Sequence, residues 1–148
     1  MPARTDLTTD LFHTVGRFRR QLRRTAGGSF AGVTQSQAEL LRLVGRRPDI
    51  SVREAAEELS LAANTASTLV SKLTADQLLV RSVDPDDRRI GRLRLTEPAQ
   101  QLADQTRASR RAALDVVLNQ LDDEQISDLT KGLNVLAEMT RMLQENQS

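Results

Sequence analysis

A change in hydrophobic periodicity at residue 79 constrains the fold more than any other feature of this chain. Before it, apolar residues recur every three or four positions, whereas residues 79–83 and 90–95 combine Val, Leu and Ile with alternating arginine. The polar run Asp84-Pro85-Asp86-Asp87-Arg88-Arg89 separates these two segments. The pattern predicts two short antiparallel strands joined by a polar loop, which is a β-hairpin.

Two helices are predicted at the start of the chain. Apolar residues at steps of three and four indicate an amphipathic helix over residues 6–25, and the glycines that follow indicate a loop over 26–33. Thr34-x-x-Gln37 has the spacing of a capping box, in which the two side chains bond each other's backbone amides. It opens a second helix, which ends at Arg47-Pro48.

Two shorter helices lead into the hairpin. Ser51-x-x-Glu54 is a second capping-box pattern and opens a third helix of about two turns. A tight connection at residues 60–62 is followed by a fourth helix, whose buried side carries Ala66, Leu69, Val70 and Leu73. Two short helices joined by a tight turn and followed by a basic hairpin are specific for a winged helix-turn-helix.

Two longer helices close the chain. Thr96 is expected to cap the first, with Pro98 tolerated in its opening turn, and Asp122-x-x-Gln125 opens the second. The apolar residues of the last helix are spaced 3, 4, 3 and 7, close to a heptad seam: Ile126, Leu129, Leu133, Leu136 and Leu143.

These elements predict a mainly α fold with a small β-hairpin, of the α+β class. The 148 residues form one domain. A winged helix-turn-helix lobe that binds DNA covers 34–96, and a helical dimerisation region covers 1–30 and 97–148. The seam of the last helix is too long for so small a lobe to cover, which favours a homodimer, although packing of the last helix on the first accounts for the same stripe.

The fourth helix has an outward face of short polar side chains. Most solvent-exposed helix faces carry long charged residues, but here only Lys72 is long. Short side chains let a helix sit deep in the major groove of duplex DNA and reach base edges. The predicted contacts on this helix are Asn64, Thr65, Ser67, Thr68, Ser71 and Lys72.

The hairpin concentrates positive charge on a small projecting element. Its arginines suit DNA phosphates and a narrow minor groove, and the neighbouring aspartates suit charge-assisted hydrogen bonds that orient them. An Asp-x-Asp calcium loop is the alternative, but the glycine and distal glutamate of an EF-hand are missing from this segment. The predicted DNA contacts here are Asp87, Arg88, Arg89 and Arg92.

The stretch from Leu61 to Thr96 resembles the MarR (multiple antibiotic resistance regulator) family of winged-helix proteins. The residues that carry the resemblance are the run 84–89, Leu73-x-x-x-x-Leu78-Leu79-x-Arg81 and the closing 93–96. It implies that Asp87 holds Arg89 in the minor groove. Two positions depart from the family pattern: Ala62 stands at a usual Ser or Thr cap, and Gln77 stands at a usual glycine. The first departure costs about 1 kcal/mol of helix stability, and the second leaves the expected left-handed turn strained or absent.

The resemblance also implies a small anionic aromatic effector, bound between the dimer helices and the lobe. Arg17 and Arg46 are the candidates to meet its carboxylate, with His13 as a third effector-binding residue. The three phenylalanines, Phe12, Phe18 and Phe30, are interpreted as core.

Charge and composition narrow the class of protein. Residues 1–45 carry seven basic and three acidic side chains, whereas residues 95–148 carry five and nine, so the last third should avoid DNA. Without cysteine there is no thiolate metal site or disulfide, and no metal or cofactor is predicted. The chain has no run of apolar residues long enough to span a membrane and its first ten residues do not resemble a signal peptide, so the expected location is the cytoplasm.

Three classes of function are compared. The first is a sequence-specific transcription regulator, a repressor that binds a palindromic operator as a homodimer and is released by an effector. The second is a non-enzymatic architectural or protein-interaction module that binds DNA without sequence preference. An enzyme is the third, and the sequence offers no nucleophile–histidine pairing, metal cluster or phosphate loop for one.

Overall fold

The computed structural model describes residues 3–26 and 30–147. In chain order its elements are α1 (Arg4–Ala26), α2 (Gln35–Arg46), β1 (Ile50–Ser51), α3 (Val52–Glu58), α4 (Ala63–Ala75), β2 (Leu79–Val83), β3 (Gly91–Leu95), α5 (Glu97–Leu118) and α6 (Asp123–Glu145). The predicted mainly helical fold with a small hairpin is confirmed. The glycine-containing centre of the predicted 26–33 loop lies outside the described residues.

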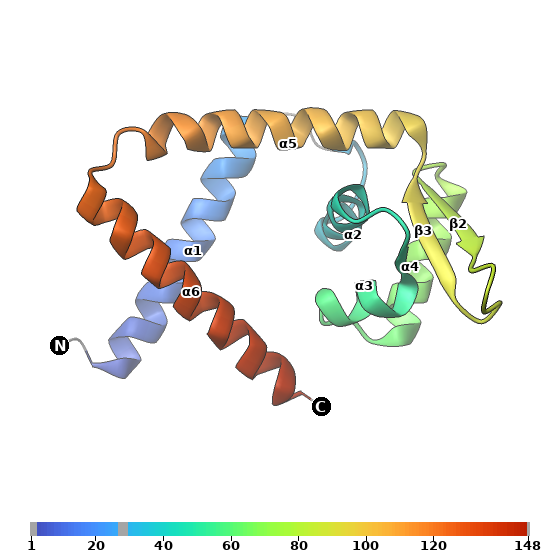
Figure 1. The fold of residues 1–148 in the computed structure, drawn as a ribbon, viewed down its shortest axis with the longest axis horizontal. Coiled ribbons are helices and arrows are strands. Elements are labelled where there is room, and N and C mark those ends of the chain that lie inside the picture. The colour runs from blue at the N-terminus through green and yellow to red at the C-terminus, as the bar shows by residue number, and fades with distance from the viewer. Residues whose placement is uncertain (1–2, 27–29, 148) are drawn as a thin grey trace.

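The long helix α5 organises the molecule. Figure 1 shows α2, α3, α4 and the hairpin gathered near the start of α5, while α1 and α6 lie towards its other end. Helix α1 packs on α5, and α2 packs on both α5 and β3. The lobe and the two terminal helices are therefore connected mainly through α5.

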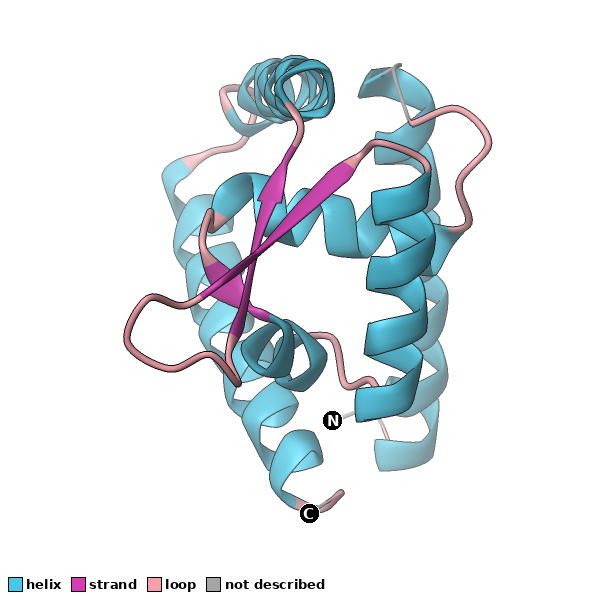
Figure 2. Cartoon of the chain, turned by 90° about the vertical axis from the view of Figure 1, so that its right-hand side faces the viewer, coloured by secondary structure: helices cyan, strands magenta, loops and turns pink. Residues whose placement is uncertain are grey.

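The sheet has three strands rather than the predicted two. Its order is β1-β3-β2, with both pairs antiparallel. In the added pair, Ile50 lies opposite Leu93 and Ser51 lies opposite Arg92. A strand of two residues is too short to show alternation, so the sequence pattern identified Ser51 only as a helix cap. The loop between β2 and β3 projects beyond the helices (Figure 2).

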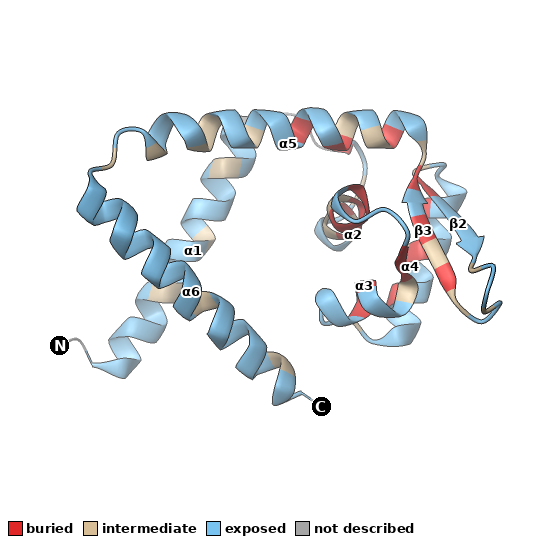
Figure 3. Ribbon diagram, viewed as in Figure 1, coloured by how far each residue is buried: buried red, intermediate tan, exposed pale blue. Residues whose placement is uncertain are grey.

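The core lies within the lobe and against the first half of α5. Figure 3 shows the buried residues concentrated there, with α1 and α6 almost entirely exposed. Among the described residues, the largest fully buried side chains are Leu40, Leu41, Leu43, Leu73, Leu79, Leu93, Val44 and Val70.

The interpretation of all three phenylalanines as core is wrong for two of them. Phe30 is buried, but Phe12 is 79% exposed and Phe18 is 55% exposed. Both exposed rings lie on α1, away from the lobe whose packing fills the core. A single chain provides no cover for them in the part that the structure describes.

The helix starts follow the predicted chemistry except at α5. The capping boxes at Thr34 and Asp122 are both formed, and Ser51 accepts a hydrogen bond from the Glu54 amide at 3.0 Å. Thr96 does occupy the cap position of α5, but its side chain caps nothing there. Its hydroxyl instead donates to the carbonyl oxygen of Gln77 at 2.9 Å, which ties the start of α5 to the turn before β2.

Gln77 adopts the left-handed turn whose presence its side chain put in doubt. Its φ is +61°, and the Leu78 amide donates to the Leu73 carbonyl at 2.9 Å, as in a helix-ending turn. The left-handed region costs a residue with a Cβ about 1–2 kcal/mol, whereas glycine adopts it freely.

We therefore expect Gln77→Gly to stabilise the lobe. Relief of the left-handed strain, less the added chain entropy of glycine, should raise the free energy of unfolding by about 0.5–1 kcal/mol in urea melts. Ala75→Gly, two residues earlier at the end of α4, is the matched control and should lower it by about 0.5–1 kcal/mol. Destabilisation by Gln77→Gly would contradict this account of the turn.

Candidate nucleic-acid interface

Helix α4 presents its short polar side chains to solvent. Ala66, Val70 and Leu73 are buried against the core. The six residues predicted to contact DNA are all exposed: Asn64, Thr65, Ser67, Thr68, Ser71 and Lys72. The hydroxyl of Thr68 donates to the Asn64 carbonyl at 2.9 Å, so its proton is used within the helix and its methyl group remains available. Lys72 forms an exposed ion pair with Asp76 at 3.2 Å.

The start of α4 lacks a side-chain cap, as the alanine at position 62 predicts. Ala62 has extended backbone angles but makes no capping hydrogen bond. The Asn64 side chain partly compensates, because its oxygen accepts the Thr65 amide at 2.9 Å. One of the free amides at the helix start is thereby satisfied from within the predicted contact surface.

The loop of the hairpin is organised by Asp84. Its carboxylate accepts the amides of Asp86 at 2.8 Å and Asp87 at 3.1 Å, and it also accepts Nε of Arg92 at 2.9 Å. The Asp86 amide contributes most to lowering the pKa of Asp84, followed by the Arg92 side chain and the Asp87 amide. Asp84 therefore holds the turn at the start of the loop and ties this turn to Arg92 of β3.

Asp87 holds Arg89 at the tip of the hairpin. Its two carboxylate oxygens accept Nε of Arg89 at 3.1 Å and a terminal guanidinium nitrogen at 3.2 Å, and its Oδ1 also accepts the Arg89 amide at 3.0 Å. These bonds lower the pKa of Asp87, with the side-chain bond to Arg89 as the main cause. The Arg89 side chain is nonetheless 90% exposed, so it is oriented yet free to meet a ligand.

Two further arginines of β3 turn back towards the protein. Arg92 reaches Glu54 of α3 at 3.4 Å as well as Asp84, and its side chain is 30% exposed. Arg94 forms a two-pronged pair with Asp49, both bonds measuring 2.6 Å. These pairs connect the hairpin to α3 and to the turn before β1. The geometry gives Arg92 a positioning role beside the DNA contact predicted for it.

A cleft of about 950 Å³ lies between the hairpin and helices α3 and α4. Of the predicted DNA-contacting residues, Ser67, Asp87, Arg89 and Arg92 line it together. The other six are exposed but do not line this cleft: Asn64, Thr65, Thr68, Ser71, Lys72 and Arg88. Sequence reasoning missed Arg53 of α3 and Arg81 of β2, which also line it. The signal for Arg81 was its alternation with Leu79 along the strand.

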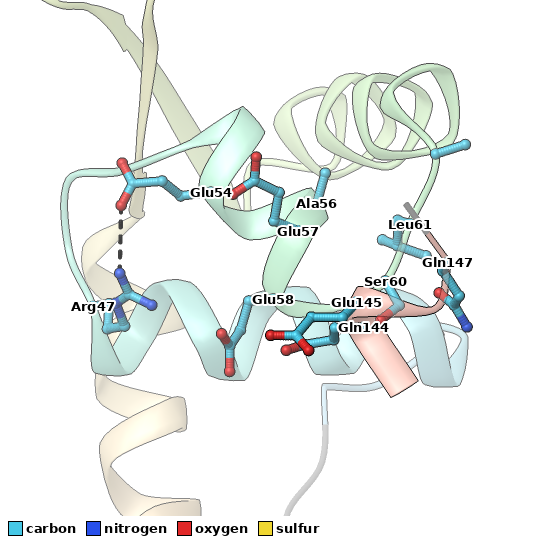
Figure 4. Close-up of a pocket in the computed structure, with 11 residues that line it drawn as sticks. Arg47, Glu54, Ala56, Glu57, Glu58, Ser60, Leu61, Gln144, Glu145 and Gln147 are labelled. Atoms are coloured by element: carbon cyan, nitrogen blue, oxygen red, sulfur yellow. Dashed lines mark hydrogen bonds and ion pairs between the residues drawn. The ribbon is translucent and has the colours of Figure 1, made fainter. Parts of the chain in front are cut away.

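A different hollow, between α3 and the C-terminal end of α6, has four glutamates and one arginine among its lining residues. Figure 4 shows Glu57 and Glu58 of α3 and Glu145 of α6 around it, with Arg47 bonded to Glu54 at one edge. Its cavity volume is about 710 Å³. Its glutamates outnumber its arginine, which disfavours DNA phosphates, whereas in the cleft beside the hairpin the arginines outnumber the carboxylates.

The structure does not bring the three predicted effector residues together. Arg46 lines a hollow between α1, α2 and α5, whereas Arg17 lines a shallow one on α1 with Arg20 and Arg24. His13 is exposed on α1 and lines neither hollow. No group of acidic or histidine residues that could hold a metal ion occurs in the described part of the chain. Among the described helices, none is long and apolar enough to cross a membrane.

The hydrogen bonds to Asp84 predict how its contribution to the stability of the fold depends on pH. Because its pKa is lowered in the folded protein, its contribution to stability is complete at neutral pH and is lost as the pH falls below about 4. In a carboxyl NMR titration we expect Asp84 to titrate below its ordinary range and Arg92→Gln to raise its midpoint. Arg94→Gln, which removes the partner of Asp49 instead, should leave that midpoint unchanged. An Asp84 midpoint at or above the ordinary value would refute this description of the loop.

The fold and the cleft define a winged helix-turn-helix protein. A sequence model of the MarR family matches residues 31–90. The chain is 24% identical over 102 residues to the HTH-type transcriptional regulator MhqR of Bacillus subtilis, covering 69% of this chain and 70% of MhqR.

Solved structures share the whole fold. FabT of Streptococcus pneumoniae, solved in complex with DNA, superposes with a TM-score of 0.78 at 20% identity, covering 94% of this chain and 96% of FabT. A MarR family protein from Bacillus stearothermophilus gives a TM-score of 0.73 at 23% identity, covering 95% of this chain and 99% of that protein. PcaV of Streptomyces coelicolor, solved in complex with its natural ligand, gives a TM-score of 0.62 at 24% identity. The superposition covers 93% of this chain and 98% of PcaV. These structures show that the chain has the winged-helix fold of MarR family proteins, and the family model matches most of the lobe that carries the cleft.

Proposed function

We propose that this protein is a sequence-specific DNA-binding repressor that binds a palindromic operator as a homodimer in the cytoplasm. The observation that carries the proposal is the exposed polar face of α4 beside the hairpin, with Ser67 of α4 and the oriented, exposed Arg89 lining one cleft. Major-groove reading by α4 beside minor-groove insertion by Arg89 is the arrangement that such a face supports. The FabT complex with DNA adds support, because FabT shares this fold.

The lobe at 34–96 then serves as the reader, and the regions 1–30 and 97–148 serve as the dimerisation region. Exposed apolar side chains along α1 and α6 support this division, since a contiguous apolar surface favours association. They are Leu7, Phe12, Val15, Phe18, Ile126, Leu129, Leu133, Val135, Met139, Met142 and Leu143.

The dimer is tested by light scattering. We expect twice the 16.4 kDa chain mass at micromolar concentration, and we expect Leu133→Glu to shift the protein towards the monomer because it places a charge in the apolar surface. Val83→Glu on β2 is the matched control: Val83 is 59% exposed and Leu133 is 55% exposed, but Val83 lies outside that surface. A monomer mass for the wild type would refute the dimer.

Operator recognition is tested by selecting bound duplexes from a random library. Two recognition helices related by a twofold axis meet successive major grooves about 34 Å apart, so the selected site should be an inverted repeat of roughly 16–20 base pairs. Asn64 favours adenine and the threonine methyls favour thymine, which predicts A·T-rich half-sites. A selected site without inverted symmetry would contradict the proposal.

Release by a small-molecule effector completes the proposal. The hollow that contains Arg46 lies between helices of the dimerisation region and α2 of the lobe, where a ligand contacts both parts. PcaV, which shares the fold, was solved with its natural ligand. A ligand that binds one orientation of the lobe more tightly increases the population of that orientation. The difference between its affinities for the two orientations limits how far it can shift the DNA-competent population.

A further inference from the structure

The hollow between α1, α2 and α5 is lined mainly by arginine. It has a cavity volume of about 320 Å³. The guanidinium groups come from all three helices: Arg19 of α1, Arg42 and Arg46 of α2, and Arg107 and Arg110 of α5. Leu59 and Ala103 provide its apolar wall, and no aromatic side chain lines it.

Much of this charge has no partner. Glu39 pairs with Arg19 at 3.0 Å, and Asp104 pairs with Arg107 at 3.4 Å. No described carboxylate lies within ion-pair distance of Arg42, Arg46 or Arg110.

Two of the unpaired arginines are also partly withdrawn from water. Arg42 and Arg110 are half-buried, and Nε of Arg110 is buried without a hydrogen-bond partner. Burial is the main cause that lowers the pKa of both groups, and neighbouring arginines lower it further, although Glu39 partly offsets the shift of the Arg42 pKa. Desolvated like charges are unfavourable unless an anion compensates them.

We propose that this hollow binds a small polyanion with at least two anionic groups, such as a phosphorylated metabolite or a polycarboxylate. One carboxylate pairs well with one guanidinium fork, so three unpaired forks call for more than one anionic group. An aromatic acid would find no stacking partner in the lining. The proposal replaces the anionic aromatic effector expected from the sequence with a different chemical class.

The hollow contacts both the DNA-binding lobe and the long helices α1 and α5. Under the proposed function, an effector acts by changing the orientation of the lobe. Leu59 caps the end of α3, and Arg42 and Arg46 belong to α2. The hollow is therefore lined by two helical parts of the DNA-binding lobe. Arg19 and Arg110 belong to the long helices. A polyanion that draws these groups together fixes the lobe relative to α1 and α5, and this regulatory consequence rests on the proposed function.

The test measures anion binding by calorimetry on the full chain without DNA, at constant ionic strength. Inorganic pyrophosphate and citrate represent the two polyanion sources, and salicylate represents a singly charged aromatic acid. We expect one pyrophosphate or citrate per chain, bound at least about tenfold more tightly than salicylate. Which of the two binds more tightly distinguishes a phosphate ligand from a polycarboxylate ligand.

Matched variants locate the binding. Arg42→Gln and Arg110→Gln should each weaken polyanion binding about tenfold, the loss expected for one charged hydrogen-bonded contact. Arg111→Gln removes the same charge from the next residue of α5, which is exposed and outside the hollow, and should change affinity less than about twofold. Circular dichroism checks folding, and the exposed Arg46→Gln provides a third variant if a half-buried one unfolds.

Three results would overturn the proposal. They are salicylate binding as tightly as the polyanions, an equal loss in Arg111→Gln, and absence of anion binding together with a weaker dimer in Arg42→Gln. The last would mean that carboxylates of a second copy occupy the hollow. Operator binding is measured separately, so a wild type that binds operator but no polyanion contradicts only this inference.

Discussion

Leu93→Ala should lower the free energy of unfolding by about 2–5 kcal/mol, the range for removing a fully buried leucine side chain. Leu93 is 0% exposed and lies on β3, the middle strand, opposite Ile50 on one side and Arg81 on the other. Its loss leaves a cavity between the sheet and the helices of the lobe. Because domains of this size are stable by only about 5–15 kcal/mol, the effect should be plain in urea melts.

The matched control for Leu93→Ala is Val80→Ala on the neighbouring strand. Val80 is 48% exposed, so its truncation should change the free energy of unfolding by less than about 0.5 kcal/mol. Equal effects at the two positions would show that the lobe core is not centred on β3 as described.

Arg89→Ala should weaken operator binding by about 1–3 kcal/mol and make its salt dependence shallower by up to about one unit. Arg89 is held by Asp87 yet 90% exposed, which suits insertion into a narrow minor groove. Readout there reports mainly A·T against G·C, so the preferred major-groove bases should not change. Titration of operator and scrambled duplex at several salt concentrations measures both effects.

Two variants separate the role of Arg89 from those of its neighbours. Asp87→Ala should give a milder form of the same defect, because Asp87 only orients the arginine. Thr68→Ala should alter preference at one or two base positions while leaving the salt dependence nearly intact, because Thr68 is uncharged. If Arg89→Ala binds like the wild type with an unchanged salt slope, the hairpin is not a minor-groove reader.

The elements that sequence predicted best are those whose signals are local. The caps at Thr34 and Asp122 and the pairing of Asp87 with Arg89 rest on residues two or three positions apart, and the hairpin pairs residues eight to sixteen positions apart. Local spacing determines such contacts directly, since helix and turn geometry bring near neighbours together. The order of the elements and the exposed polar face of α4 followed from the same periodicities.

What sequence missed depends on residues that are distant in the chain. Strand β1 forms because Ile50 meets Leu93, and Arg94 pairs with Asp49 across 45 residues. The hydroxyl of Thr96 bonds Gln77 rather than its own helix, which no capping pattern reveals. The arginine hollow likewise contains side chains from three helices. Composition showed that the chain is rich in arginine, but not that these arginines lie together in the fold. These contacts exist only after the tertiary fold has formed.

The central claim is that this winged helix reads sequence rather than merely binding DNA. The most direct test compares the dissociation constants of the selected inverted repeat and of a scrambled duplex of equal length and composition, at physiological salt. The account predicts a ratio of at least about 10³, the lower range for specific regulators, with two chains bound per operator. Equal affinities for the two duplexes would contradict it and would favour an architectural module that binds DNA through charge alone.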